Sequence, residues 1–204
     1  MGRTLYHILE WITRFAYINI LWLATTLLGF FFFGLFPATI ALFTIMRKWL
    51  QGEYDFPIFQ RFWHIYKQEF KRSNVFGLPL FIIGSIVGFN LLFLYFNMDI
   101  TLSLLTALLF AGMLLFGLFI FYVFPTYVHY DSSLAALYKN AFFIMLVSPI
   151  QSLGIIVTFV AFSLLIYVFP AIAMIFGSSF YALVTSLFAQ RAFQKVEEKQ
   201  SNIS

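Results

Sequence analysis

Residues 102–124 read LSLLTALLFAGMLLFGLFIFYVF and contain no charged side chain. An α-helix rises about 1.5 Å per residue, so a helix of roughly 20 residues covers the hydrocarbon core of a bilayer. No face of this run is polar, and a helix that is apolar all round needs protein or lipid on every side. The stretch therefore predicts a helix that spans a membrane.

The composition extends this prediction to the whole chain. Of its 204 residues, 62% are hydrophobic and 10% are charged, and the mean hydropathy is +0.93. Soluble domains carry about 45–50% apolar and about 25% charged residues. The 30 phenylalanines could line a site for sugar rings or cations, but we favour side chains that face lipid. We therefore predict an all-α membrane protein.

Further apolar runs predict a bundle of about six transmembrane helices in one domain over residues 1–190, followed by a charged cytoplasmic tail over residues 191–204. The predicted spans cover about residues 17–33, 38–50, 73–96, 102–124, 141–168 and 171–189. Proline is expected to break or kink them at Gly34–Pro37, at Pro125 and at Pro149. The first two runs are short, so residues 17–50 form either two thin spans or one bent span with a re-entrant tail.

Three shorter segments predict amphipathic helices at the cytoplasmic membrane surface, over about residues 3–16, 58–72 and 129–140. In the second of them, aromatic side chains recur on one face and basic or polar side chains on the other. A basic, aromatic helix lies in the membrane interface and is attracted by anionic lipid. The residues predicted to anchor this helix are Arg61, Trp63, Lys67, Lys71 and Arg72.

The basic residues predict the orientation of the chain. With six spans and the N-terminus inside, all 12 lysines and arginines lie in cytoplasmic segments, and Asp99 is the one ionisable residue outside. A five-span arrangement would move Arg3 and Arg14 to the other side, so six spans fit the positive-inside rule better. We predict that both termini are cytoplasmic. The net charge of +4 is too small and too segregated to indicate binding to nucleic acid.

The polar residues inside the predicted spans are neutral. Ion-coupled transport and proton relays usually need an ionisable group within the membrane, and no span has one near its middle. Asn90 and Gln151 could line a path for a small neutral solute. We favour the other interpretation, in which these residues form hydrogen bonds between helices.

Small residues recur at helical spacing on two spans. The third carries Ser73, Gly77, Gly84 and Gly88 on one face, and the sixth carries Ser178, Ala182 and Ser186. Such faces let helix backbones approach closely in lipid. They predict helix packing, either within this chain, which we favour, or against a second protein.

Catalytic and metal-binding motifs are absent from the sequence. It has no H-E-x-x-H, no phosphate-binding loop, no G-x-G-x-x-G and no cysteine. The run His129-Tyr130-Asp131-Ser132-Ser133 could be considered a catalytic set, but Asp131 or Ser132 is also a good N-cap for the helix that follows. We favour the cap and predict no enzyme activity, no cofactor and no metal.

Three motifs resemble the YesL-type family of bacterial multi-pass membrane proteins, a family of unknown function. The first includes Asn19-Ile20-Leu21-Trp22 and runs from Phe33 through Pro37-Ala38-Thr39-Ile40-Ala41-Leu42 to Arg47-Lys48. The second is Phe62-Trp63 followed by Tyr66-Lys67 and Phe70-Lys71-Arg72-Ser73, and the third is Val123-Phe124-Pro125 followed by His129-Tyr130-Asp131. The resemblance implies the cell membrane of a bacterium and a link to carbohydrate utilisation, including sugar ABC transporters. It carries over no catalytic residue.

Two functions are compatible with these features. The first is a non-enzymatic accessory component of carbohydrate uptake or utilisation, which docks on a component of a sugar ABC transporter. The second is a protein that itself transports or binds a small solute or a lipid. A subunit of the permease itself is disfavoured, since the coupling loop with its Glu and Gly is missing between Asp131 and Pro149.

Overall fold

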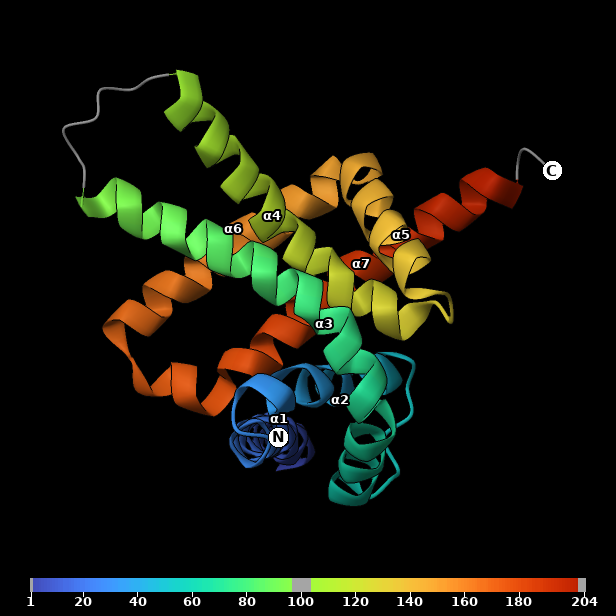
Figure 1. Cartoon of the computed structure of the whole chain (residues 1–204). Helices are drawn as coiled ribbons and strands as arrows, with labels where there is room; N and C mark the ends of the chain where they lie inside the picture. Colours follow the sequence, from blue (N-terminus) through green and yellow to red (C-terminus); the bar gives the residue numbers. More distant parts are fainter. Residues whose placement is uncertain (1, 97–103, 202–204) are drawn as a thin grey trace.

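The computed structural model describes residues 2–96 and 104–201, and within them every regular element is an α-helix (Figure 1). The seven described helices are α1 (Gly2–Leu28), α2 (Phe32–Leu50), α3 (Ile58–Phe96), α4 (Leu104–His129), α5 (Leu134–Val147), α6 (Pro149–Val168) and α7 (Ala171–Ser201). All except α5 are long and apolar enough to cross a membrane. The predicted all-α membrane architecture, with about six such helices, is confirmed.

The first two helices form a hairpin whose turn differs from the prediction. The turn lies at Gly29, Phe30 and Phe31, and both phenylalanines have positive φ, at 53° and 64°. A Cβ on Gly29 would lie 2.3 Å from the Cα of Gly34, so both positions need glycine for the two helices to approach. The sequence predicted a break at Pro37, which is wrong because Pro37 lies inside α2.

A proline inside a helix leaves the carbonyl four residues earlier without its usual donor. For Pro37 that carbonyl belongs to Phe33, and the side-chain amide of Asn74 in α3 donates to it at 3.0 Å. The continuous α1 also joins the predicted interfacial helix over residues 3–16 to the first span. Residues 17–50 therefore belong to two helices and not to one bent helix, and α1 gains its length from its N-terminal flank.

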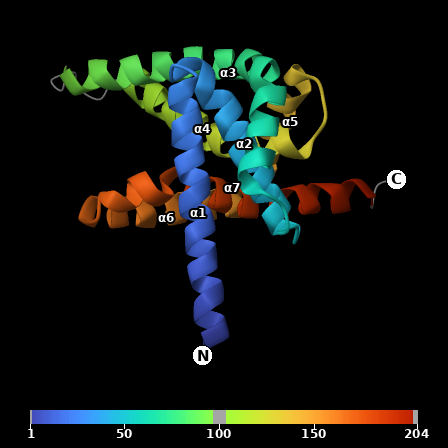
Figure 2. The ribbon, with the colours of Figure 1, turned by 90° about the horizontal axis from the view of Figure 1, so that it is seen from below.

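α3 joins the predicted amphipathic segment over residues 58–72 to the third predicted span in one helix, which changes direction along its length (Figure 2). Pro79 lies inside α3 and cannot donate to the carbonyl of Val75, which is a usual cause of a bend. The hydroxyl of Tyr138 in α5 donates to the neighbouring carbonyl of Phe76. This hydrogen bond ties the segment of α3 just before Pro79 to α5.

The boundaries after α4 also differ from the prediction. Pro125 lies inside α4, which continues to His129. The predicted helix over residues 129–140 and the span over residues 141–168 are replaced by α5 and α6, which meet at Ser148. Ser148 precedes Pro149 and is not helical, with φ −121° and ψ 57°, because a following proline disfavours the helical conformation. Pro149 therefore starts a helix instead of kinking one.

Two further expectations concern the ends of segments. The last predicted span ends near residue 189, but α7 continues as a helix to Ser201. The predicted turn at Asn97, Met98 and Asp99 and the end of the tail at residues 202–204 lie outside the described residues. The extra turns of α7 carry its C-terminal part beyond the rest of the molecule (Figure 1).

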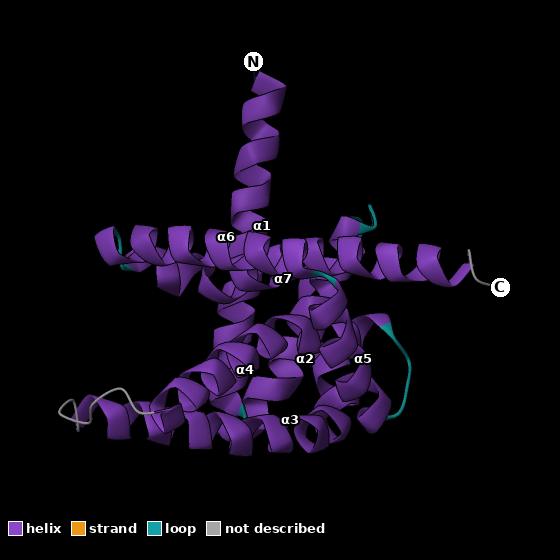
Figure 3. Cartoon of the chain, turned by 90° about the horizontal axis from the view of Figure 1, so that it is seen from above, coloured by secondary structure: helices purple, strands orange, loops and turns teal. Residues whose placement is uncertain are grey.

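The core surrounds α2. Its apolar side chains are buried from Phe36 to Trp49, while α3, α4, α6 and α7 keep many exposed leucine, isoleucine and phenylalanine side chains. α1 runs across α4, α6 and α7 instead of alongside them, and its first part extends beyond them (Figures 2 and 3). Protein thus encloses α2 on most sides, and the apolar outer faces of the other helices suit a lipid environment.

Candidate functional site

Asn19 is a buried polar residue of α1 whose side chain forms hydrogen bonds with α7. Its side chain is 1% exposed and bonds to α7. The amide nitrogen donates to the carbonyl of Met174 at 2.6 Å, and the backbone N–H of Ser178 donates to the amide oxygen at 2.9 Å. An uninterrupted α-helix joins such a carbonyl and N–H to each other, so Asn19 inserts into the hydrogen-bond ladder of α7. This clasp holds α1 across α7.

Other polar side chains also join one helix to another. Four such bonds are Tyr66 to the Thr25 carbonyl at 3.2 Å, Trp22 to Thr39 at 3.0 Å, Tyr122 to Ser152 at 2.9 Å and Tyr181 to the Ile120 carbonyl at 3.0 Å. They connect α1 with α2 and α3, and α4 with α6 and α7. Buried polar groups need such partners, and here they are supplied by neighbouring helices.

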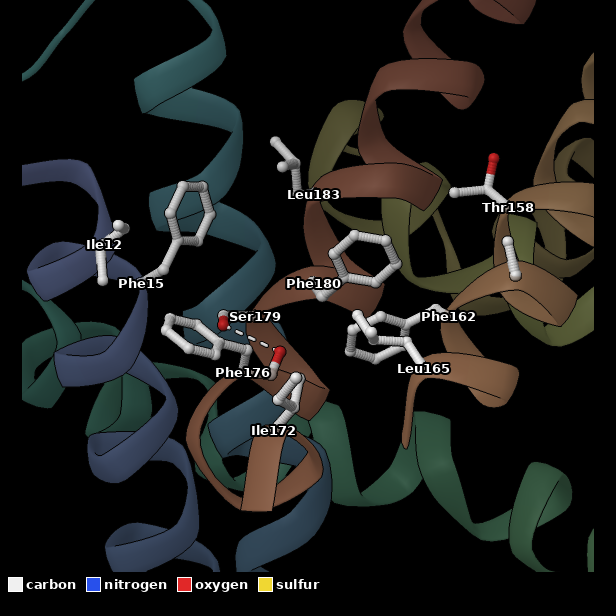
Figure 4. A pocket seen from close by; sticks show the side chains of 11 residues that line it. Ile12, Phe15, Thr158, Phe162, Leu165, Ile172, Phe176, Ser179, Phe180 and Leu183 are labelled. Carbon is white, nitrogen blue, oxygen red and sulfur yellow. Dashed lines mark hydrogen bonds between the residues drawn. The ribbon is translucent and has the colours of Figure 1, made fainter. Parts of the chain in front are cut away.

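An apolar cavity lies where α1 crosses α6 and α7 (Figure 4). Its volume is about 530 Å³, and the rings of Phe15, Phe162, Phe176 and Phe180 line much of it. Two of these rings, Phe162 and Phe180, stack with their centroids 3.8 Å apart. Only two hydroxyls line the cavity, and each is engaged within its own helix: Thr158 donates to Gly154 at 2.8 Å and Ser179 to Phe176 at 3.1 Å. The cavity is therefore suited to an apolar ligand.

A charged cavity of about 390 Å³ lies between α2, α3 and the end of α4. The titratable side chains in its lining are three guanidinium groups, two carboxylates, two tyrosines and one histidine: Arg47, Arg61, Arg72, Glu69, Asp131, Tyr127, Tyr130 and His129. Arg47 comes from the last turn of α2, and the first part of α3 supplies Arg61, Glu69 and Arg72. Residues from α2, α3 and α4 and from the loop after α4 thus bring these charged side chains to one place.

The two carboxylates of the charged cavity have different surroundings. Glu69 accepts a hydrogen bond of 2.6 Å from the hydroxyl of Tyr127, a residue that is only 7% exposed. Asp131 has a side chain that is 97% exposed and lies 3.5 Å from Arg72. Arg72 also donates to the carbonyl of Ser132 at 2.9 Å and lies over the Tyr127 ring. Asp131 is thus a partner of Arg72, whereas the sequence proposed it as an N-cap.

The N-cap of α5 is Ser133, whose hydroxyl accepts from the backbone N–H of Ala136. The expectation that Asp131 or Ser132 caps this helix is wrong, because the helix starts later, at Leu134. In the described residues, no three His, Asp or Glu side chains gather as a metal site would require.

A loop after α2 borders the charged cavity. Lys48 donates to Glu53, and this hydrogen bond holds the pKa of the Glu53 carboxyl below its usual range, with a smaller contribution of the same sign from Arg61. Glu53 therefore pairs with Lys48, and Arg61 lies near enough to contribute to its electrostatic surroundings.

The predicted anchor residues divide between two surfaces. Arg61 and Arg72 line the charged cavity and Lys67 and Lys71 do not, although all four residues are exposed. We call His64, Lys67 and Lys71 the basic stripe, since they follow one another at helical spacing and are exposed. Trp63 is half-buried beneath Lys67, whose ammonium group lies 5.1 Å from the ring centroid. Contact of this helix with lipid stays a prediction.

The predicted solute path is not formed by either cavity. Asn90, in the last turns of α3, donates to the Ile86 carbonyl of its own helix at 2.8 Å. Gln151 lies in the first turn of α6, and its buried oxygen has no hydrogen-bond partner among the described residues. Neither side chain lines the apolar or the charged cavity.

The small residues of α3 pack in one half only. Ser73 is buried, and a Cβ on Gly77 would lie 2.2 Å from the Phe36 ring. At Gly84 a Cβ would make ordinary contact with Phe116 at 3.7 Å, and at Gly88 it would meet nothing within 4 Å. On α7, Ser178 bonds to Asn19, and Ala182 and Ser186 are buried.

Sequence reasoning missed Arg47, Glu69 and Tyr127 as members of one site. The sequence showed Arg47 only as part of a family motif and among the cytoplasmic basic residues, whereas in the structure its Nη1 donates to the carbonyl of Val128 at 2.6 Å. Glu69 and Tyr127 are far apart in the sequence, and no local pattern links them. The signal that could have pointed to this site was the pair of basic residues in the last turn of α2, because a helix C-terminus stabilises cations there.

Comparison with known proteins gives one family. A family model described as "Protein of unknown function, DUF624" matches residues 15–91. The uncharacterized protein YteU of Bacillus subtilis (strain 168) is 38% identical over 199 residues, which cover 97% of this chain and 88% of YteU. YesV and YesL of the same strain, also uncharacterized, are 36% and 30% identical over 92% and 95% of this chain and 90% and 91% of their own lengths. No solved structure matches significantly. The similarity thus extends far beyond residues 15–91.

Proposed function

The chain belongs to the DUF624 family of proteins of unknown function, as do its YesL-type relatives, and on that premise we propose that it is a non-enzymatic accessory component of bacterial carbohydrate uptake or utilisation. It would reside in the cell membrane with both termini in the cytoplasm, as the distribution of basic residues predicts. Its partner would be a component of a sugar ABC transporter.

The basic stripe of α3 is the observation that carries this proposal. Phe62 and Tyr66 on the opposite face of the helix are buried in the protein core, so the helix is fixed and its basic side faces outward. Exposed charge on a fixed element favours a partner of opposite charge and speeds its association. The polar groups inside the bundle meanwhile bond to neighbouring helices, which suits a scaffold better than a solute path.

Charge reversal on the stripe tests the proposal. We expect the double variant Lys67→Glu, Lys71→Glu to recover roughly tenfold less ABC permease than the unaltered chain when it is solubilised from cells that express both, because electrostatic attraction becomes repulsion. The measurement is quantitative mass spectrometry of the purified material.

Arg191→Glu serves as the matched control, because Arg191 is an exposed basic residue on α7, away from the stripe. It should retain the permease. If the unaltered chain purifies alone, as a single well-behaved species, the accessory role is wrong.

The apolar cavity favours a second function, the binding of a lipid. A volume of 530 Å³ lined by phenylalanine rings, with both hydroxyls already bonded to their own helices, is suited to an acyl chain and offers few polar partners to the hydroxyl groups of a sugar. The cavity lies between elements held together by the Asn19 clasp, so its shape depends on α1.

Filling the apolar cavity tests this second function. Ala161 lines it, and we expect Ala161→Trp to lose the most tightly retained lipid, because the indole occupies the space of an acyl chain. Native mass spectrometry of the detergent-purified protein counts the bound lipids. Leu164→Trp places the same ring at an exposed site of α6 that does not line the cavity and should keep the lipid. Equal retention by both variants would contradict lipid binding in this cavity.

A further inference from the structure

Two of the three guanidinium groups in the charged cavity have no carboxylate partner. Arg47 is half-buried, and its one hydrogen bond is the donation to the Val128 carbonyl; its Nε is buried without a partner among the described residues. The Arg61 side chain is exposed and forms no hydrogen bond and no ion pair with any residue that the structure describes, although its charge helps to lower the pKa of the Glu53 carboxyl. A half-buried charge such as that of Arg47 is normally paired, because removing it from water is costly.

The two carboxylates of the cavity do not meet this need. Glu69 is engaged by the Tyr127 hydroxyl, and Asp131 is almost fully exposed beside Arg72. Three guanidinium groups thus stand against two carboxylates, and neither carboxylate pairs with Arg47 or Arg61: Glu69 accepts from Tyr127, and Asp131 lies beside Arg72. Ile40, Ile65 and Val128 form apolar parts of the wall, which lower the local dielectric and strengthen the attraction for an anion.

We propose that the charged cavity binds a phosphate group, held by Arg61 and Arg47 with support from Arg72. The planar guanidinium group donates two parallel hydrogen bonds to phosphate, a geometry that carboxylates also accept. A phosphate carries between one and two negative charges, which offsets the excess of one positive charge in the cavity. The volume of 390 Å³ leaves room for a group attached to the phosphate.

The same chemistry has two possible sources, a soluble phosphate compound or the headgroup of an anionic phospholipid. The test uses the full chain in detergent with inorganic phosphate, and the full chain in nanodiscs of phosphatidylcholine with or without phosphatidylglycerol. The readout is the midpoint of thermal unfolding, with chloride at equal ionic strength as the reference. A rise with inorganic phosphate assigns a soluble ligand, and a rise with phosphatidylglycerol alone assigns the headgroup.

Arg61→Gln is the decisive variant. The Arg61 side chain forms no hydrogen bond with a described residue, so its replacement should not unfold the protein. It should weaken the apparent affinity for the responding anion roughly tenfold, as expected for one charge-assisted interaction. Lys67→Gln removes the same charge from the same helix outside the cavity and should respond like the unaltered chain. The proposal is overturned if neither anion raises the midpoint above the chloride reference, or if the two variants respond alike.

Discussion

Alanine at position 34 is expected to prevent the hairpin between α1 and α2 from closing. A Cβ on Gly34 would lie 2.5 Å from the carbonyl oxygen of Thr26 and 2.7 Å from that of Thr25. Both are backbone atoms of the facing helix, so no side chain can turn away to relieve the contact. Exchanging glycine for alanine inside a helix normally stabilises by about 0.5–1 kcal/mol, and here the sign reverses.

We expect Gly34→Ala to cost on the order of 3 kcal/mol, which is a large part of the stability of a typical domain. The measurements are the yield of monodisperse protein on size exclusion and the midpoint of thermal unfolding in detergent. Gly88→Ala is the matched control, because a Cβ there meets nothing within 4 Å. It should leave the yield unchanged and raise the midpoint slightly. A normal yield and midpoint for Gly34→Ala would refute the close approach of the two helices.

Leucine at position 19 is expected to release α1 from α7. The change removes the amide that bonds to the Met174 carbonyl and to the Ser178 N–H. It places an apolar side chain against these backbone groups, which then lose their side-chain partner. The Ser178 N–H and the Met174 carbonyl can then bond to each other as in an ordinary helix. We therefore expect the free energy of unfolding to fall by about 2 kcal/mol, which is less than the sum of all the bonds removed. Thermal unfolding of Asn19→Leu measures this loss.

Asn90→Leu is the control for that experiment, since among the described residues the Asn90 amide bonds only to the Ile86 carbonyl of its own helix. Its midpoint should stay close to that of the unaltered chain. The Asn19 variant should also retain less lipid, because α1 forms one wall of the apolar cavity. Equal midpoints for the two variants would show that the clasp does not hold α1.

Much of the helical architecture could be predicted from the sequence. The runs without charge predicted about six membrane-spanning helices, and the structure has six helices that are long and apolar enough. This worked because the length and hydropathy of a span are local properties of the sequence. The segment over residues 58–72 was also correctly predicted as a helix, since its aromatic and basic residues alternate with helical periodicity.

The positions of the breaks depended on contacts between distant residues. Pro37 looked like the breaker of the first hairpin, but Asn74 supplies the donor that Phe33 lacks, and the turn falls at Gly29, where it meets Gly34. A local pattern cannot show that a residue about 40 positions away repairs a proline site. Pro149 differs, because the residue before it leaves the helical region and the helix ends there.

The candidate sites were even less predictable. Asn19 stood out in the sequence only as part of a family motif, and its partner Met174 is 155 positions away. The charged cavity joins the end of α2 with α3 and α4, so its guanidinium groups become neighbours only through the fold. Arg61 and Arg72 were singled out for a different role, as anchors in the lipid interface.

A photo-crosslinking residue on the basic stripe tests the central claim of an accessory role most directly. Benzoylphenylalanine in place of Lys67 would be irradiated in intact bacteria that express the chain with a sugar ABC transporter, and the same residue in place of Leu164, on the exposed apolar face of α6, would serve as the reference. The account predicts an adduct with a transporter component from position 67 and none from position 164. Adducts with lipid alone at both positions would contradict it.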